Sequence, residues 1–175
     1  MKDKMLYIFV EGNDDERFFS AIVVPRLKKE YLKVEVIKYA QWKKEKVSSF
    51  ISSIRTLGFH YIFTADLDNF STLGEKKRFL KERFSDLNTD LAEIVIKEIE
   101  SWYYAGLDLD FAYQKQLKVL DSTDNLFKEE FNLLYHGKFK SRIDFMSELL
   151  KNFDHNSARQ RNASYRYFAK KYLQK

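Results

Sequence analysis

Three acidic residues, Glu11, Asp66 and Asp68, stand where two short apolar runs of this chain end. Residues 5–10 precede the glutamate, and residues 61–65 precede the two aspartates, which are one residue apart. Carboxylates so close repel each other unless a cation lies between them. Ligand sets made only of oxygen suit Mg²⁺ or Mn²⁺. The pattern therefore predicts a metal site at the ends of these two runs.

The apolar runs have the character of buried strands. Residues 61–65 show no polar alternation, as expected of a strand covered on both faces of a parallel sheet. Residues 5–10 are rich in β-branched and aromatic side chains, and we expect two more strands at 33–39 and 92–97. Strands that alternate with helices predict a Rossmann-like α/β fold with a four-stranded parallel sheet flanked by helices. The carboxyl ends of its strands share one edge, where such sheets bind ligands.

Helical patterns fill the segments between and after these strands. Apolar residues recur at helical spacing in 47–57, and Gly58 follows as a left-handed cap. Pro25 should end or kink a helix that begins near Asn13. Beyond residue 107 every apolar pattern is helical and no linker intervenes. We expect one domain overall, with an α/β core at 1–107 and a helical C-terminal extension at 108–175 packed on it.

Two motifs resemble the TOPRIM superfamily, the metal-dependent catalytic domain of topoisomerases, primases and OLD-type nucleases. The motifs are Glu11-Gly12 after one strand and Asp66-Leu67-Asp68 after another. The spacing from Glu11 to Asp15 is similar to the Glu-Gly-x-x-Asp of the OLD-like branch. Segments 98–102 and 159–168 resemble parts of small stand-alone TOPRIM-like proteins that are often encoded beside an ABC-type ATPase.

The resemblance implies hydrolysis of nucleic acid, with one or two Mg²⁺ or Mn²⁺ ions as cofactors. It also implies an ABC-type ATPase as a partner, and it assigns a role to each acid. Glu11 would act as general acid and base and as a ligand, beside the ligands Asp66 and Asp68. Asp15 and Glu100 would complete a two-metal site, although Glu98 competes with Glu100 for this role. OLD nucleases also use a lysine, for which the sequence offers no clear counterpart. Asp15 has a second explanation, since acids are favoured in any first helical turn.

Composition narrows the function classes further. The chain has no cysteine, which excludes disulfides, thiolate metal sites and a cysteine nucleophile. No run approaches the roughly 18 apolar residues of a membrane helix, so we expect a cytoplasmic protein with no membrane partner. Residues 136–175 have a net charge of +7 and the rest of the chain −2. This basic tail suits DNA or RNA, with Arg159, Arg161 and Arg166 as phosphate contacts, or it is a solvated helix face.

Two other functions fit parts of the pattern. A non-catalytic module could use the acids as a metal-dependent surface for nucleic acid or a partner ATPase. Haloacid-dehalogenase-like phosphatases also carry Asp-x-Asp after a strand, but follow it with x-Thr or x-Val, where this chain has Phe70. Their motif should also come on the first strand of the domain. Cleavage of nucleic acid would separate the nuclease from both alternatives.

Overall fold

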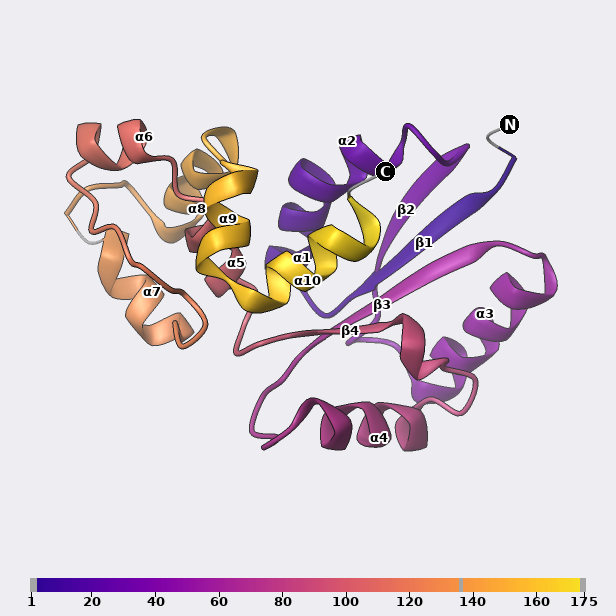
Figure 1. Ribbon diagram of the computed structural model, residues 1–175. Helices are drawn as coiled ribbons and strands as arrows, with labels where there is room; N and C mark the ends of the chain where they lie inside the picture. Colours follow the sequence, from indigo (N-terminus) through magenta and orange to yellow (C-terminus); the bar gives the residue numbers. More distant parts are fainter. Residues whose placement is uncertain (1–2, 136, 174–175) are drawn as a thin grey trace. The chain divides into compact units, whose positions relative to one another are not determined.

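The computed structural model describes residues 3–135 and 137–173. The chain forms two compact units, Met1–Ile94 and Val95–Lys175, and each is described by itself (Figure 1). The division falls before the last residue of the fourth strand, whereas the sequence patterns placed a boundary near residue 107. Glu100 consequently belongs to the second unit, and Glu11, Asp15, Asp66 and Asp68 belong to the first.

A four-stranded, all-parallel sheet confirms the expected α/β fold. Its spatial order is β2-β1-β3-β4. The strands are β1 (Met5–Val10), β2 (Lys33–Lys38), β3 (His60–Asp66) and β4 (Ala92–Val95). β1 pairs in register with β2 up to Val10↔Lys38 and with β3 up to Phe9↔Phe63. Because the strands are parallel and aligned, the residues that follow β1, β2 and β3 come out at the same edge.

Helical segments connect the strands of this unit. They are α1 (Asn13–Phe18), η1 (Phe19–Val23), α2 (Val24–Leu27), α3 (Lys44–Thr56), α4 (Leu73–Arg83) and η2 (Thr89–Leu91). η1 is a π-helical turn that leads directly into α2, which has Pro25 in its first turn. Proline has no N–H to donate and clashes with the preceding turn. The wider π turn before it accommodates the proline, so helical structure continues through Pro25 to Leu27 rather than ending there.

The two faces of the sheet bury different side chains. On one face Phe9 and Phe63 pack with Ile51 of α3 and with Leu80 and Phe84 of α4 and its C-cap. Alternate residues of a strand point to opposite faces. Accordingly β1 also buries a second apolar set, and α1 and α2 lie on the side opposite to α3 and α4 (Figure 1). Both faces are therefore covered, which explains why the central strands β1 and β3 lack polar alternation.

The second unit is helical, as expected beyond residue 107. Its helices are α5 (Glu100–Ala105), α6 (Leu109–Gln114), α7 (Lys128–Tyr135), α8 (Arg142–Lys151), α9 (His155–Arg161) and α10 (Ala163–Tyr172). Its core is aromatic, with Trp102, Phe131 and Phe145 almost fully buried. An antiparallel bridge joins Leu107 to Phe153. Among the helices of the described residues, none is both long and apolar enough to cross a membrane.

Candidate functional site at the sheet edge

Glu11 is the first residue after β1, and two other strand ends hold its carboxylate. Its Oε1 accepts a hydrogen bond from the Asp66 backbone N–H, with an N–O distance of 3.3 Å. The same oxygen lies 3.1 Å from the hydroxyl of Tyr39, the residue after β2. The Tyr39 hydroxyl is also 3.2 Å from the Thr64 carbonyl oxygen, so its single proton serves one of two acceptors at a time. The ends of β1, β2 and β3 thus meet at Glu11.

The environment of Glu11 raises its pKa from the ordinary value of 4.5. Burial is the largest cause, because it disfavours the charged form. The positive charge of Lys76 opposes this rise, and the negative charge of Asp68 adds to it. A carboxyl group with a raised pKa takes up and releases a proton more readily near neutral pH, as general acid and base catalysis requires.

Tyr39 was not anticipated from the sequence as a part of this site. Its side chain is 5% exposed, and burial together with the neighbouring Glu11 charge raises its pKa well above 10. The hydroxyl therefore stays protonated and acts as a hydrogen-bond donor. The available signal was its position directly after β2, since that position falls at the same edge as Glu11.

Asp66 ends β3, and Asp68 follows in a tight turn. Asp68 has a φ of 51°, in the left-handed region that aspartate tolerates better than most residues. Its Oδ2 lies 2.5 Å from Nζ of Lys76. The Asp68 side chain is 53% exposed, but that of Lys76 is only 4% exposed. The second aspartate therefore has a cationic partner supplied by the protein itself.

Lys76 is the residue whose importance the sequence patterns missed. It is the fourth residue of α4, whose start is fixed by Thr72, the acceptor for Glu75 N–H at 3.2 Å. Its Nζ lies 5.2 Å from the ring centre of Phe70 and 5.9 Å from that of Phe79. A cation near a helix N-terminus opposes the helix dipole. A lysine in the first turn of the helix that follows Asp-x-Asp is therefore unfavourable for the helix. This unfavourable position could have indicated that Lys76 has a role in the site.

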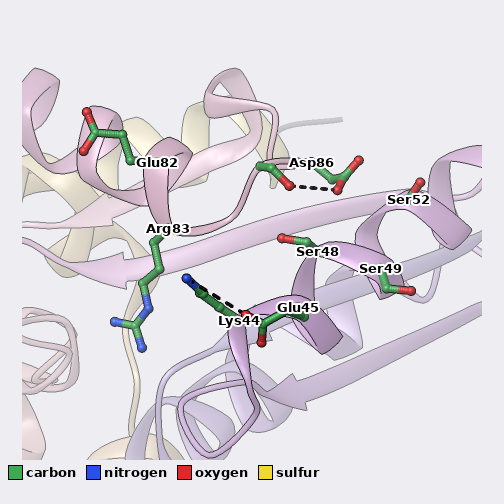
Figure 2. A pocket seen from close by; sticks show the side chains of 9 residues that line it. Lys44, Glu45, Ser48, Ser49, Ser52, Glu82, Arg83 and Asp86 are labelled. Atoms are coloured by element: carbon green, nitrogen blue, oxygen red, sulfur yellow. Dashed lines mark hydrogen bonds and ion pairs between the residues drawn. The ribbon is translucent and has the colours of Figure 1, made fainter.

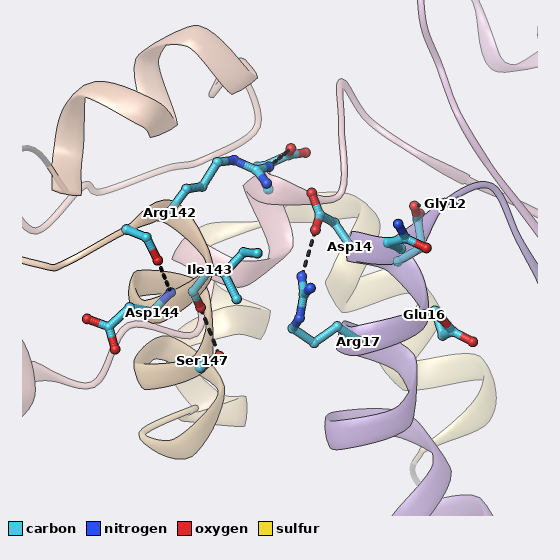
Figure 3. Close-up of polar contacts among 12 residues, drawn as sticks. Gly12, Asp14, Glu16, Arg17, Arg142, Ile143, Asp144 and Ser147 are labelled. Atoms are coloured by element: carbon cyan, nitrogen blue, oxygen red, sulfur yellow. Dashed lines mark hydrogen bonds and ion pairs between the residues drawn. The ribbon is translucent and has the colours of Figure 1, made fainter.

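The acids of the first turn of α1 have partners within the first unit. Asp15, which is 7% exposed, accepts a hydrogen bond from the Gly12 backbone N–H at 3.1 Å. Asp14 pairs with Arg17 at 2.6 Å (Figure 3), and Glu16 pairs with Lys38 at 2.7 Å. These contacts give Asp15 a part in starting the helix, and its role as a metal ligand stays a prediction.

Glu100 is buried in the second unit, where it forms an ion pair with Arg142, the first residue of α8. Arg142 also donates to the Asn132 side chain, with an Nε–O distance of 2.9 Å. Burial is the main reason that the pKa of Glu100 is raised from 4.5. Glu98, the competing candidate, accepts the Lys128 backbone N–H at 2.7 Å. Each glutamate therefore has a structural contact inside its own unit.

Two of the three candidate phosphate-binding arginines donate to backbone carbonyls of the second unit. Arg161 Nη1 lies 2.7 Å from the Leu107 carbonyl oxygen. Arg166 Nη1 lies 3.1 Å from the Arg159 carbonyl oxygen, and Arg166 is exposed. Each guanidinium has five N–H donors, so one such contact leaves others that can meet phosphate. Arg166 is the most accessible of the three.

A cleft of about 500 Å³ lies elsewhere in the first unit, between α3 and the end of α4 (Figure 2). Serines of α3 line it, together with two basic and three acidic side chains. Lys44 and Glu45 approach each other to 3.9 Å, and Ser85 donates to Asp86 at 3.2 Å. None of the candidate acids lines this cleft, and its mixed charges select neither an anion nor a cation.

Within residues 3–135 and 137–173, no group of three or more His, Asp or Glu side chains is close enough to hold a metal ion. Comparisons with protein-family models, with curated proteins and with solved structures found no match. The geometry of the chain itself must therefore support any functional conclusion.

Proposed function

We propose that this protein hydrolyses phosphodiester bonds of nucleic acid with Mg²⁺ or Mn²⁺, as a TOPRIM-type nuclease. The observation that supports the proposal most strongly is the contact between two strand ends. The Asp66 backbone N–H donates to the Glu11 carboxylate, so two acidic residues 55 positions apart in the sequence lie at one sheet edge. Asp68 lies close enough to influence the pKa of Glu11. Solubility alone does not require acids from separate strands to converge.

The donor set at this edge fits a hard divalent cation, because it offers only carboxylate oxygens. In the described part of the chain, no three acidic or histidine side chains surround one point. Mg²⁺ is commonly held by one or two carboxylates and completes its shell with water and substrate phosphates. Asp66 and Asp68 would be those carboxylates. A bound ion would supply charge neutralisation and a water of lowered pKa.

The residues of the chain have separable roles in this proposal. Tyr39 and the Asp66 backbone N–H orient the Glu11 carboxylate through the same oxygen, Oε1. The other oxygen of Glu11 is then the one available to exchange a proton with the leaving group or with water. In the protein without a bound ion, burial raises the pKa of Glu11 above its ordinary value.

A second candidate function is a non-catalytic module that binds nucleic acid or a partner ATPase. The ion pair between Asp68 and Lys76 favours it, because the pair compensates one acidic charge without a metal. In that case the acids would contribute to a surface and would need no catalytic ion.

Metal dependence separates these two functions. The protein would be incubated with single- and double-stranded DNA and RNA in Mg²⁺, Mn²⁺, Ca²⁺ or EDTA, and binding would be measured in parallel. We expect cleavage in Mg²⁺ or Mn²⁺ and none in EDTA. Cleavage that persists in EDTA would contradict the metal site. Binding without cleavage in any metal would support the module instead.

A further inference from the structure

Lys76 occupies an unusual place for a lysine. Its side chain is 4% exposed, and its ammonium group has an aspartate on one side and two aromatic rings nearby. The rings belong to Phe70 and Phe79, and their centres are 5.1 Å apart. Lysine keeps its charge in such a place only when an anion or another strong acceptor compensates the loss of water. Asp68 supplies this compensation.

The two partners depend on each other unequally. Asp68 is about half exposed and can be solvated by water when its partner leaves. Lys76 is buried and loses its compensation when Asp68 is taken by another cation. A second positive charge beside Asp68 would also repel the ammonium at short range. The ammonium can move away only toward another anion or toward water, and its four-carbon stem permits such movement.

We propose that Lys76 and the divalent cation compete for Asp68, and that substrate phosphate resolves this competition by accepting the Lys76 ammonium. The inference rests on the metal site of the proposed function. In the absence of nucleic acid Lys76 holds Asp68 and the ion binds weakly. When a phosphate enters, Lys76 transfers its ion pair to the phosphate and Asp68 becomes available. Metal loading is thereby coupled to the presence of substrate.

The test measures Mn²⁺ binding, by calorimetry and by the spin-resonance signal of free Mn²⁺, without and with a short DNA oligonucleotide. Lys76→Met removes the competing charge and keeps an apolar stem beside the rings. Lys77→Met, the next residue of α4, removes the same charge and is the matched control. Lys76→Gln provides a second variant should Met prevent folding, which a thermal melt would show.

Without DNA, we expect Lys76→Met to bind Mn²⁺ about tenfold more tightly than the parent, equivalent to about 1.4 kcal/mol. Lys77→Met should match the parent. DNA should tighten Mn²⁺ binding by the parent and have little effect on Lys76→Met. Equal Mn²⁺ affinity of the parent and both Lys76 variants, or no detectable binding by any of them, would overturn the inference.

Failure of the inference and failure of the proposed function are distinguishable, because the readout is metal occupancy rather than cleavage. A parent protein that cleaves nucleic acid while Lys76 variants bind Mn²⁺ as the parent does would retain the nuclease function and refute the competition. Tighter Mn²⁺ binding by the variants together with a parent that never cleaves would support the competition and refute the nuclease.

Discussion

At the residue scale, the structure changes what the paired aspartates imply. Considered alone, Asp66 and Asp68 are like charges that repel each other. In the folded protein Lys76 approaches Asp68 to 2.5 Å, so the local charge is partly balanced before any metal binds. The stability of the metal-free protein therefore depends on Asp68 through its buried partner.

Asp68→Asn should accordingly destabilise the metal-free protein, because it leaves the Lys76 ammonium buried without its counter-ion. Breaking a fully buried pair costs about 3–5 kcal/mol, and exposure of Asp68 reduces this to about 1–2 kcal/mol. Urea unfolding in EDTA would measure the loss. The Lys76→Met background provides the control, since Asp68→Asn should cost much less there. Equal stability of Asp68→Asn and parent would contradict the importance of this pair.

The sequence revealed the acids at this edge but not the residues that accompany them. Glu11, Asp66 and Asp68 could be found because each follows an apolar run, and parallel strands bring such positions together. Tyr39 and Lys76 could not, because their contacts join segments that only the folded chain brings together. The role of Asp15 could not be decided from the sequence, because an acidic residue in a first helical turn stabilises the helix whether or not it also binds a metal.

At the element scale, N-cap side chains stabilise helices of the second unit. Asp154 is the N-cap of α9, and its side chain accepts the backbone N–H groups of Asn156 and Ser157. Burial alone would raise the pKa of Asp154, but a hydrogen bond with the Ser157 side chain and those from the two backbone N–H groups outweigh it and lower the pKa below its ordinary value of 3.8. The cap therefore stabilises the fold in its ionised form.

Asp154→Ala should lower the free energy of unfolding by about 1 kcal/mol at neutral pH, as the loss of an N-cap typically does. Because the folded pKa is the lower one, the ionised side chain contributes its full stability above pH 3.8 and loses it as the pH falls through the folded pKa. The difference between parent and Asp154→Ala should shrink in that acidic range. Urea unfolding at several pH values would measure it, and a difference that grows on acidification would contradict the assignment.

Gly106, the C-cap of α5, should tolerate no side chain. A Cβ built there would lie 2.1 Å from a ring carbon of Phe153, in the segment bridged to Leu107. Gly106→Ala must displace that ring and should destabilise the protein by about 1–3 kcal/mol. Gly74→Ala is the control, since the nearest atom there is 3.9 Å away and alanine favours a helix. Thermal melts that show equal losses for both variants would contradict this account.

At the scale of the whole molecule, opposite charges lie in different parts of the chain. The candidate acids Glu11, Asp66 and Asp68 belong to the first unit, and the basic residues of 136–175 belong to the second. The sequence predicted the sheet and the helical character of the C-terminal part, because both follow from the spacing of apolar side chains. The boundary at Ile94 and Val95 could not be predicted in this way, since no change of composition marks it.

Arg166→Gln should weaken nucleic-acid binding in a salt-dependent manner. Each lost phosphate contact on duplex DNA reduces the slope of log affinity against log salt by about 0.9. Lys29→Gln removes one exposed charge from the first unit and should leave the slope unchanged. Arg161 is a poorer choice for this test, because it is less exposed than Arg166 and its contact with a backbone carbonyl oxygen is shorter, 2.7 Å against 3.1 Å. Equal slopes for parent and Arg166→Gln would indicate that this arginine is only a solvated side chain.

The central claim, that the acids at the sheet edge form a catalytic site, is tested most directly by the cleavage rate of Glu11→Gln in Mn²⁺. Glutamine preserves the size of the side chain and an oxygen for Tyr39 and Asp66 N–H, but it cannot exchange the proton. We expect the rate to fall by about 10² to 10⁴ while the melting temperature stays close to that of the parent. Glu16→Gln, with its partly exposed side chain on α1, should cleave as the parent does. Cleavage by Glu11→Gln at the parent rate would contradict the account.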